Sequence, residues 1–476
     1  MKKVFEKLRE NSIFISNDKF TILLFFIIII NFLPIGITNA FTKQTPAESS
    51  TIIEIGCLLL EYLCLFIFFL VHYKEIKLDK RKVISLIIVT VVLFLAQINN
   101  YIQGFFKYKD ILNIGIFFVN VFFYYIIIYD YKIKEKNVLK FYKCIILFAL
   151  IAILWNIVMF WKEIIAEIGF IDPYFDYSNI NNIKGFFGNR AGLSFLILLA
   201  IIANRIIREY YPSKIKDYLF NILFFFGIWS THSKTTYLLM ILLFLVFIII
   251  DNKKWKKLIP LTITLLISTV GFVNVLGYFP KTIEKEIIKI NESRYEENDD
   301  HYDNNKTIGD NVNDNKKEEN NFDKQESDEK LSELVVSKNR IYNLSGRVAI
   351  WKSTLEFLKK NPLNIIIGVG KFSANRLLTV NGKQYQHFHN LLLELVMTGG
   401  LIELLYVMIL YISVVRRVIK SGLSKKIKII YFSSFIVYFI NSMMETYGKF
   451  SIGYHDALCL IFFIAMPLLH ANSLKD

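Results

Sequence analysis

The sequence lacks the motifs of nucleotide-driven and metal-dependent enzymes. It contains no P-loop, no G-x-G-x-x-G, no H-E-x-x-H and no D-x-D carboxylate pair. We therefore expect no energy coupling by nucleotide hydrolysis, no metal and no cofactor. Cysteine is also scarce, and Cys57, Cys64, Cys144 and Cys459 all fall in apolar runs. The sequence thus indicates neither a disulfide framework nor a thiolate metal site.

Long apolar runs dominate the rest of the chain. Hydrophobic residues make up 54% of it and aromatic residues 16%, which favours a membrane protein over a soluble one. Unbroken apolar runs exclude a membrane β-barrel, whose strands alternate. We predict an all-α polytopic membrane protein with about twelve transmembrane helices. The expected spans are residues 20–39, 51–72, 83–98, 111–129, 143–161, 191–207, 216–230, 235–250, 258–278, 390–415, 427–444 and 452–470.

Lysine and arginine are concentrated in alternate connections between these spans. The basic stretches are 2–9, 74–82, 132–140, 205–216, 253–257 and 416–426, whereas 40–50, 100–110 and 445–451 carry little charge. Basic connections stay in the cytoplasm, so both termini are expected there and the long loop outside. The net charge of +15 is then a topology signal. We expect no nucleic-acid binding, because no basic run is interleaved with aromatic residues.

A polar segment separates spans nine and ten. Residues 295–330 are mostly Asn, Asp, Glu and Lys, so we expect them to be disordered. From Ser345 onward, Val348, Trp351, Leu355 and Leu358 recur at helical spacing, and Pro362 ends the pattern. This predicts an amphipathic helix on the outer membrane surface or over the bundle, followed by an extended stretch and turn at 365–370.

These boundaries divide the chain into five parts. They are a cytoplasmic segment (1–19), spans one to nine (20–278), an extracytoplasmic loop (279–389) with a catalytic segment (345–389), spans ten to twelve (390–470) and a cytoplasmic tail (471–476).

Three of the basic residues on the expected outer side are candidates for the site. Arg347 falls in the first turn of the predicted amphipathic helix, where its guanidinium and free backbone N–H groups would converge on an anion. It could instead stack on Trp351 or be solvated. Arg190 lies at the outer boundary of span six, where an interfacial snorkelling role is the alternative. Lys234 lies in a tight turn between spans seven and eight.

His389 immediately precedes span ten, with Asn390 beside it and His387 two residues back. Imidazole titrates near neutral pH and can take a proton from an attacking sugar hydroxyl. An interfacial histidine without a role is the alternative, and H-x-H alone is weak ground for a metal site. His455 and Asp456 are secondary candidates.

Several carboxylates fall within or at the ends of spans, where charge is costly unless it faces the bundle interior or water. We expect them to pair with basic residues or to bind glycan hydroxyls. They are Glu54, Glu61, Glu394, Glu403 and Asp456.

Several of these residues together resemble the O-antigen ligase and O-antigen polymerase superfamily. Arg347 has Trp351 four residues on, a Gly368-Val369-Gly370 turn follows, and Gly400 comes after His389-Asn390. Residues 185–190 and Ser233-Lys234 also look like family positions, the latter often holding arginine. The chain departs from the ligases at Glu403, where they carry Gly, Thr or Tyr, and in its acidic insert.

The resemblance implies metal-independent, inverting glycosyl transfer on the outer face of the bacterial cytoplasmic membrane. The donor would be a glycan on undecaprenyl diphosphate. The acceptor would be a second lipid-linked glycan in an O-antigen or capsule polymerase, or a lipopolysaccharide core sugar in a ligase. Arg347, Arg190 and Lys234 would hold the diphosphate, and His389 would be the general base. Other implied partners are membrane lipids and a chain-length regulator or flippase of the same pathway.

Two further classes stay open. A polysaccharide or lipid-linked oligosaccharide flippase is also polytopic and basic, but it would line a central path with charges from many spans. A non-catalytic scaffold is the third. The gathering of unusual polar groups at one face favours the enzyme.

Overall fold

The structure, a computed structural model, describes residues 20–42, 50–104, 106–166, 190–231, 233–251, 347–377, 379–380, 383–384, 388–444 and 454–474. These residues are helical apart from short connections and one antiparallel pair of two-residue strands, β1 (Thr379–Val380) and β2 (Lys383–Gln384). The helices are α2 (Phe20–Thr42), α3 (Ser50–His72), α4 (Lys80–Ile102), α5 (Tyr108–Val121), η2 (Phe122–Ile127), α6 (Glu135–Ala166), α7 (Arg190–Tyr210), α8 (Lys214–Ser230), α9 (Lys234–Ile250), α12 (Arg347–Lys360), α13 (Pro362–Ile367), α14 (Lys371–Leu377), α15 (Leu391–Lys420), α16 (Lys425–Met444), α17 (Tyr454–Leu460), η7 (Ile461–Ala465) and α18 (Met466–Asn472).

Helices occupy every expected span except 258–278, which lies outside the described residues. In the described part of the chain, 6 helices are long and apolar enough to cross a membrane. They include α4, α6, α7, α15, α16 and the joined α5–η2, and several shorter apolar helices accompany them. The all-helical class is therefore confirmed.

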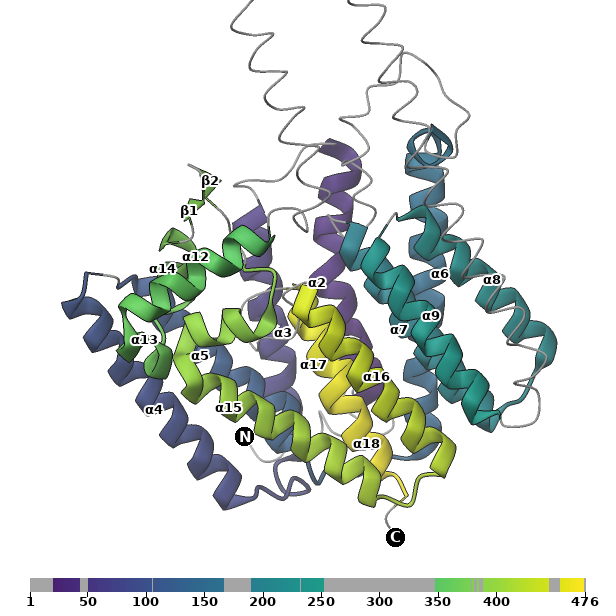
Figure 1. Ribbon diagram of the computed structural model, residues 1–476. Coiled ribbons are helices and arrows are strands. Elements are labelled where there is room, and N and C mark those ends of the chain that lie inside the picture. Colours follow the sequence, from purple (N-terminus) through teal and green to yellow (C-terminus); the bar gives the residue numbers. More distant parts are fainter. Residues whose placement is uncertain are drawn as a thin grey trace, which may run out of the picture.

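The helices pack into a bundle, with α12, α13 and α14 gathered at one end (Figure 1). α6 packs against α7, α7 against α8, and α16 against α9. The bundle interior is rich in aromatic side chains, and Tyr124, Tyr142, Phe195 and Phe224 are fully buried in it. α4 also exposes Ile84, Ile88, Val91 and Leu95. A helix that is apolar on its exposed face as well as its buried one suits a lipid surrounding.

Ion pairs connect the helix ends at the opposite end of the bundle. Arg205 of α7 pairs with Glu209 at 2.9 Å and also with Asp251, which follows α9. Arg417 of α15 pairs with Asp130 at 2.7 Å. At the start of α4, the hydrogen bond from Lys82 lowers the pKa of Asp79, whose side chain also accepts the Arg81 N–H. These contacts hold the basic connections against the bundle.

The region after α12 is partly different from the expected one. α12 ends at Lys360, before Pro362, as predicted. Residues 365–367, however, belong to helix α13 and are not extended. Pro362 explains the error, because a proline in the first turn of a helix has a suitable φ and needs no N–H partner. The turn at residues 368–370 is present, and Gly368 and Gly370 both have positive φ.

The long helix α15 is broken at Gly399 and Gly400. Gly400 has φ 70° and ψ −166°, which divides α15 into a first segment (391–398) and a second segment (401–420). Figure 1 shows the helix changing direction there. The N–H groups of Val369 and Gly370 donate to the carbonyls of Met397 (2.8 Å) and Thr398 (2.9 Å). The glycine turn thus satisfies carbonyls that the break leaves free.

Gly400 leaves no room for a side chain. A Cβ there would lie 2.1 Å from the Ile366 carbonyl oxygen, and its positive φ is unfavourable for other residues. We predict that Gly400→Ala lowers the free energy of unfolding by at least about 2 kcal/mol. Thermal unfolding of the detergent-purified protein measures this.

Gly115 of α5 is the matched control, because a Cβ there meets nothing within 4 Å. Gly115→Ala should stabilise the protein slightly, by up to about 1 kcal/mol. Equal unfolding midpoints for Gly400→Ala and the wild type would contradict the role given to the break.

Candidate functional site

The backbone of Phe388 connects α12 to the start of α15. Trp351 of α12 donates its indole N–H to the Phe388 carbonyl at 3.0 Å. On the other side of the same residue, the Phe388 N–H donates to the buried carboxylate of Glu394 at 3.2 Å. The residue before His389 is therefore fixed through both its N–H and its C=O.

His389 follows with φ 50°, in the left-handed region. Few residues other than glycine adopt this region, and strain of this kind is common at functional sites. His389 is half-buried. Asn390 then caps α15, its side-chain oxygen accepting the Leu393 N–H at 3.1 Å. Hydrogen bonds on both sides of His389 thus determine where its side chain starts.

Arg347 is the first residue of α12 and is half-buried. It stands one turn before Trp351, and residues four apart share a helix face. Because Trp351 bonds the residue next to His389, the fold brings the Arg347 end of α12 to the His389 turn. This is one half of the predicted site.

The other two predicted basic residues belong to the first turns of α7 and α9. Arg190 begins α7 and Lys234 begins α9; the side chains of both lie outside what the structure describes. Ser194 of α7 and Thr236 of α9 are hydrogen-bonded at 2.9 Å, and Thr236 also bonds Ser233 at 2.9 Å. These hydroxyls join the two helix starts. Figure 1 places them at the same end of the bundle as α12.

The secondary candidates are only partly described. His387 lies outside the described residues, and so does the side chain of His455, the second residue of α17. Asp456, in the first turn of α17, is buried, with 2% of its surface exposed. It lies near Tyr62, Tyr411 and Tyr438, inside the bundle.

The buried carboxylates have specific partners. Glu61 of α3 accepts hydrogen bonds from Asn31 of α2, at 2.7 Å, and from Tyr124 of η2. Of the two expected kinds of partner, a basic residue or a glycan hydroxyl, neither is the observed one: both donors are neutral side chains of the protein itself. Glu394 accepts the hydrogen bond from the Phe388 N–H. The Glu403 carboxylate occupies the space beside Gly399. The side chain of Glu54 is not among those described.

Asp110 is a buried acid that the sequence analysis missed. It lies in the first turn of α5, and it accepts the Phe372 N–H at 2.7 Å and the Ser373 hydroxyl at 2.6 Å. Its partners are 262 and 263 residues away in sequence. The available signal was a lone carboxylate at the start of an apolar block.

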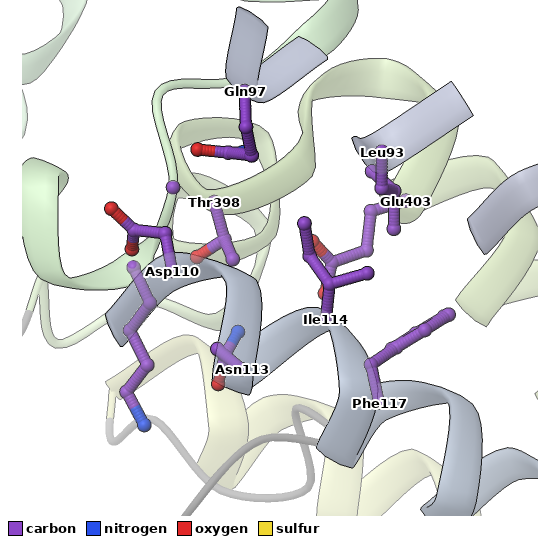
Figure 2. Close-up of a pocket in the computed structure, with 10 residues that line it drawn as sticks. Leu93, Gln97, Asp110, Asn113, Ile114, Phe117, Thr398 and Glu403 are labelled. Carbon is purple, nitrogen blue, oxygen red and sulfur yellow. The ribbon is translucent and has the colours of Figure 1, made fainter. Parts of the chain in front are cut away.

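Asp110 lines a small polar cavity beside the break in α15. Figure 2 shows Gln97, Asp110 and Thr398 on one side of it and Ile114, Phe117 and Glu403 on the other. Gly370 and Lys371 also line this cavity. It therefore lies between the glycine turn, α4 and α5.

Among the residues that the structure describes, no group of three or more His, Cys, Asp or Glu side chains is arranged to hold a metal ion. The arrangement at the α12 end is instead a histidine on a constrained turn with basic residues at three helix starts. Such a set can accept a proton and bind an anion.

The apolar helices define an integral membrane protein. A family model described as O-antigen ligase matches residues 219–408, which include Lys234, Arg347 and His389 but not Arg190. Residues 219–408 thus match an O-antigen ligase domain, and the resemblance to the O-antigen ligase and polymerase superfamily is confirmed. The family indicates a glycosyltransferase-like enzyme of polysaccharide biosynthesis that uses a lipid-linked glycan and a polysaccharide acceptor. No curated protein matches the chain.

The bond between Trp351 and Phe388 gives a direct test of this geometry. Trp351→Phe keeps an aromatic ring but leaves the Phe388 carbonyl without the indole donor. We predict a loss of about 1 to 3 kcal/mol in the free energy of unfolding and faster amide exchange at residues 389 and 390. Hydrogen exchange with mass spectrometry measures the second effect.

Leu355→Ala on the same helix is the control, because Leu355 is 50% exposed. It should change the free energy of unfolding by less than about 0.5 kcal/mol. Unchanged exchange at residues 389 and 390 in Trp351→Phe would show that the indole bond does not restrain the His389 turn.

Proposed function

We propose that this protein transfers a glycan from undecaprenyl diphosphate to an acceptor glycan on the outer face of the bacterial cytoplasmic membrane. The observation that carries the proposal is the bond from Trp351 to the Phe388 carbonyl. It joins a helix that begins with an arginine to a turn that holds a histidine in a strained conformation. The match to the O-antigen ligase family supports the same reaction class.

His389 acts as the general base. It takes the proton of an acceptor hydroxyl while the hydroxyl oxygen attacks the anomeric carbon of the donor sugar. The bond from that carbon to the diphosphate oxygen breaks, and undecaprenyl diphosphate leaves with the electron pair. A single displacement of this kind inverts the anomeric configuration. No metal is required in this scheme, because the protein's own cations offset the charge that develops on the leaving group.

Arg347, Arg190 and Lys234 bind the diphosphate. Each begins a helix, and the backbone N–H groups of a helix start favour a nearby anion. The Ser194–Thr236 bond keeps the starts of α7 and α9 together, which supports a common target for Arg190 and Lys234. His387, His455 and Asp456 are secondary candidates for contacts with the sugars.

The proposed topology has twelve spans with both termini in the cytoplasm. Residues 279–389 form the extracytoplasmic loop, and its catalytic part is 345–389. Alternate basic connections support this orientation. The acceptor is a second lipid-linked glycan, as in a polymerase. This choice rests on Glu403, which is buried beside the break in α15 where ligases carry Gly, Thr or Tyr.

Removing the base or the cation should abolish activity without unfolding the protein. Arg347→Ala should lower the rate about 10²- to 10³-fold, and His389→Ala about 10²- to 10⁴-fold. The assay uses purified protein in liposomes with the lipid-linked glycan that accumulates in cells lacking this gene. Gel analysis of glycan length and anchor reports the product and separates polymerase from ligase.

Lys352→Ala is the matched control, since Lys352 is an exposed cation on the same helix. It should retain wild-type activity. Wild-type product from either Arg347→Ala or His389→Ala would refute the assignment. Movement of the lipid-linked glycan between leaflets without new glycosidic bonds would favour the flippase.

A further inference from the structure

Arg347 and His389 belong to a structural unit with its own small core. We call this the site unit: α12, α13, α14, the turn at 368–370, residues 388–390 and the first segment of α15. Its core residues form a cluster separate from the main bundle core. They are Ile350, Leu358, Val369, Ala374, Phe388 and Met397. Because the site unit packs largely on itself, specific contacts must set its position on the bundle.

Two side chains of the first segment of α15, Leu391 and Leu395, join the main core. They hold one side of the site unit through apolar contacts, which are favourable but non-directional. Directional contacts are made elsewhere. Asn364 of α13 donates to Gln103, which follows α4, at 3.3 Å. Asp110 of α5 makes the stronger contact.

Asp110 holds α14 with both carboxylate oxygens. One accepts the Phe372 N–H at 2.7 Å and the other accepts the Ser373 hydroxyl at 2.6 Å. The acid is 1% exposed. A Cβ on Gly370 would lie 2.5 Å from the Asp110 carboxyl carbon, so the glycine turn is also in contact with it. Two hydrogen bonds of this length, one to each oxygen of the same carboxyl group, fix both distance and orientation.

The contact is transmitted to His389 through short, rigid links. Gly370 and Val369 donate to the carbonyls at the end of the first segment of α15. The other end of that segment begins with the Asn390 cap, and Glu394 within it accepts the Phe388 N–H. Asp110 therefore acts on the base through one turn and one two-turn helix.

We propose that Asp110 is a positioning residue for glycosyl transfer. It sets the site unit, with His389 and Arg347, against the bundle helices that begin with Arg190 and Lys234. This inference rests on the proposed function. It requires the hydrogen bonds of Asp110, and a displacement of about 1 Å at the reacting groups is enough to cost a large factor in rate.

The test compares Asp110→Ala with Asp110→Asn in the liposome assay described above. Asparagine can accept the Phe372 N–H and donate to the Ser373 hydroxyl, whereas alanine can do neither. We expect Asp110→Ala to lower kcat on the order of 10²-fold and Asp110→Asn to stay within about threefold of the wild type. The KM for the donor should change less than about fivefold in both, because two of the three cations proposed to bind the diphosphate, Arg190 and Lys234, begin helices of the bundle and do not move with the site unit.

Three outcomes would overturn the inference. They are wild-type kcat in Asp110→Ala, equal loss in Asp110→Asn, or a rise in KM as large as the fall in kcat. Ser373→Ala removes one of the two hydrogen bonds of Asp110. It tests the positioning role if Asp110→Ala does not fold. It should lower kcat about 10-fold, and no change would count against the proposal.

His389→Ala in the same assay separates the two claims. If His389→Ala is inactive while Asp110→Ala is fully active, the positioning role alone fails. If His389→Ala is active, the proposed function fails, and the positioning role of Asp110 fails together with it.

Discussion

The break in α15 is the constraint on which the site depends. An interrupted helix in an apolar bundle has carbonyls that no water can satisfy, so donors must come from the protein. Val369 and Gly370 supply them, and their approach is possible because Gly368 and Gly400 carry no side chains. The break sets the direction of the first segment of α15. That direction in turn places Asn390 and His389 beside α12.

The backbone of Phe388 shows how the fold fixes the start of the His389 residue. Its carbonyl and its N–H are bound by side chains from two helices, Trp351 of α12 and Glu394 of α15. His389 therefore begins from a fixed peptide, and its left-handed φ is imposed by the surroundings. In its proposed role as general base, a histidine held in this way would need little reorganisation when the acceptor arrives. The basic residues at helix starts complement it with positive charge.

The sequence predicted the parts of the structure that depend on local patterns. Apolar length defined the helices, and Pro362 marked the end of α12. The same proline also starts α13, so the expected extended stretch at 365–367 was wrong. Arg347, Trp351 and His389 were selected by motif, and the structure brings their segments together. Their roles and that of Arg190 remain proposals.

The contacts that position the site could not be predicted, because they join distant parts of the chain. Asp110 and Phe372 are 262 residues apart, and nothing near either residue indicates the other. Glu61 shows the same limit: the sequence suggested a basic residue or a glycan hydroxyl as its partner, and the structure shows hydrogen bonds from Asn31 and Tyr124. In both cases, tertiary packing determines which donors surround a buried acid.

The conformation of His389 has a consequence for heat tolerance. A strained backbone conformation costs about 1 to 3 kcal/mol, and this free energy is released when the surroundings loosen. We therefore expect the turn at 388–390 to be the first part of the site to relax on warming. If His389 has its proposed role, activity should then fall at temperatures where the apolar helices are still intact. Local unfolding of one turn, rather than loss of the bundle, would limit the activity.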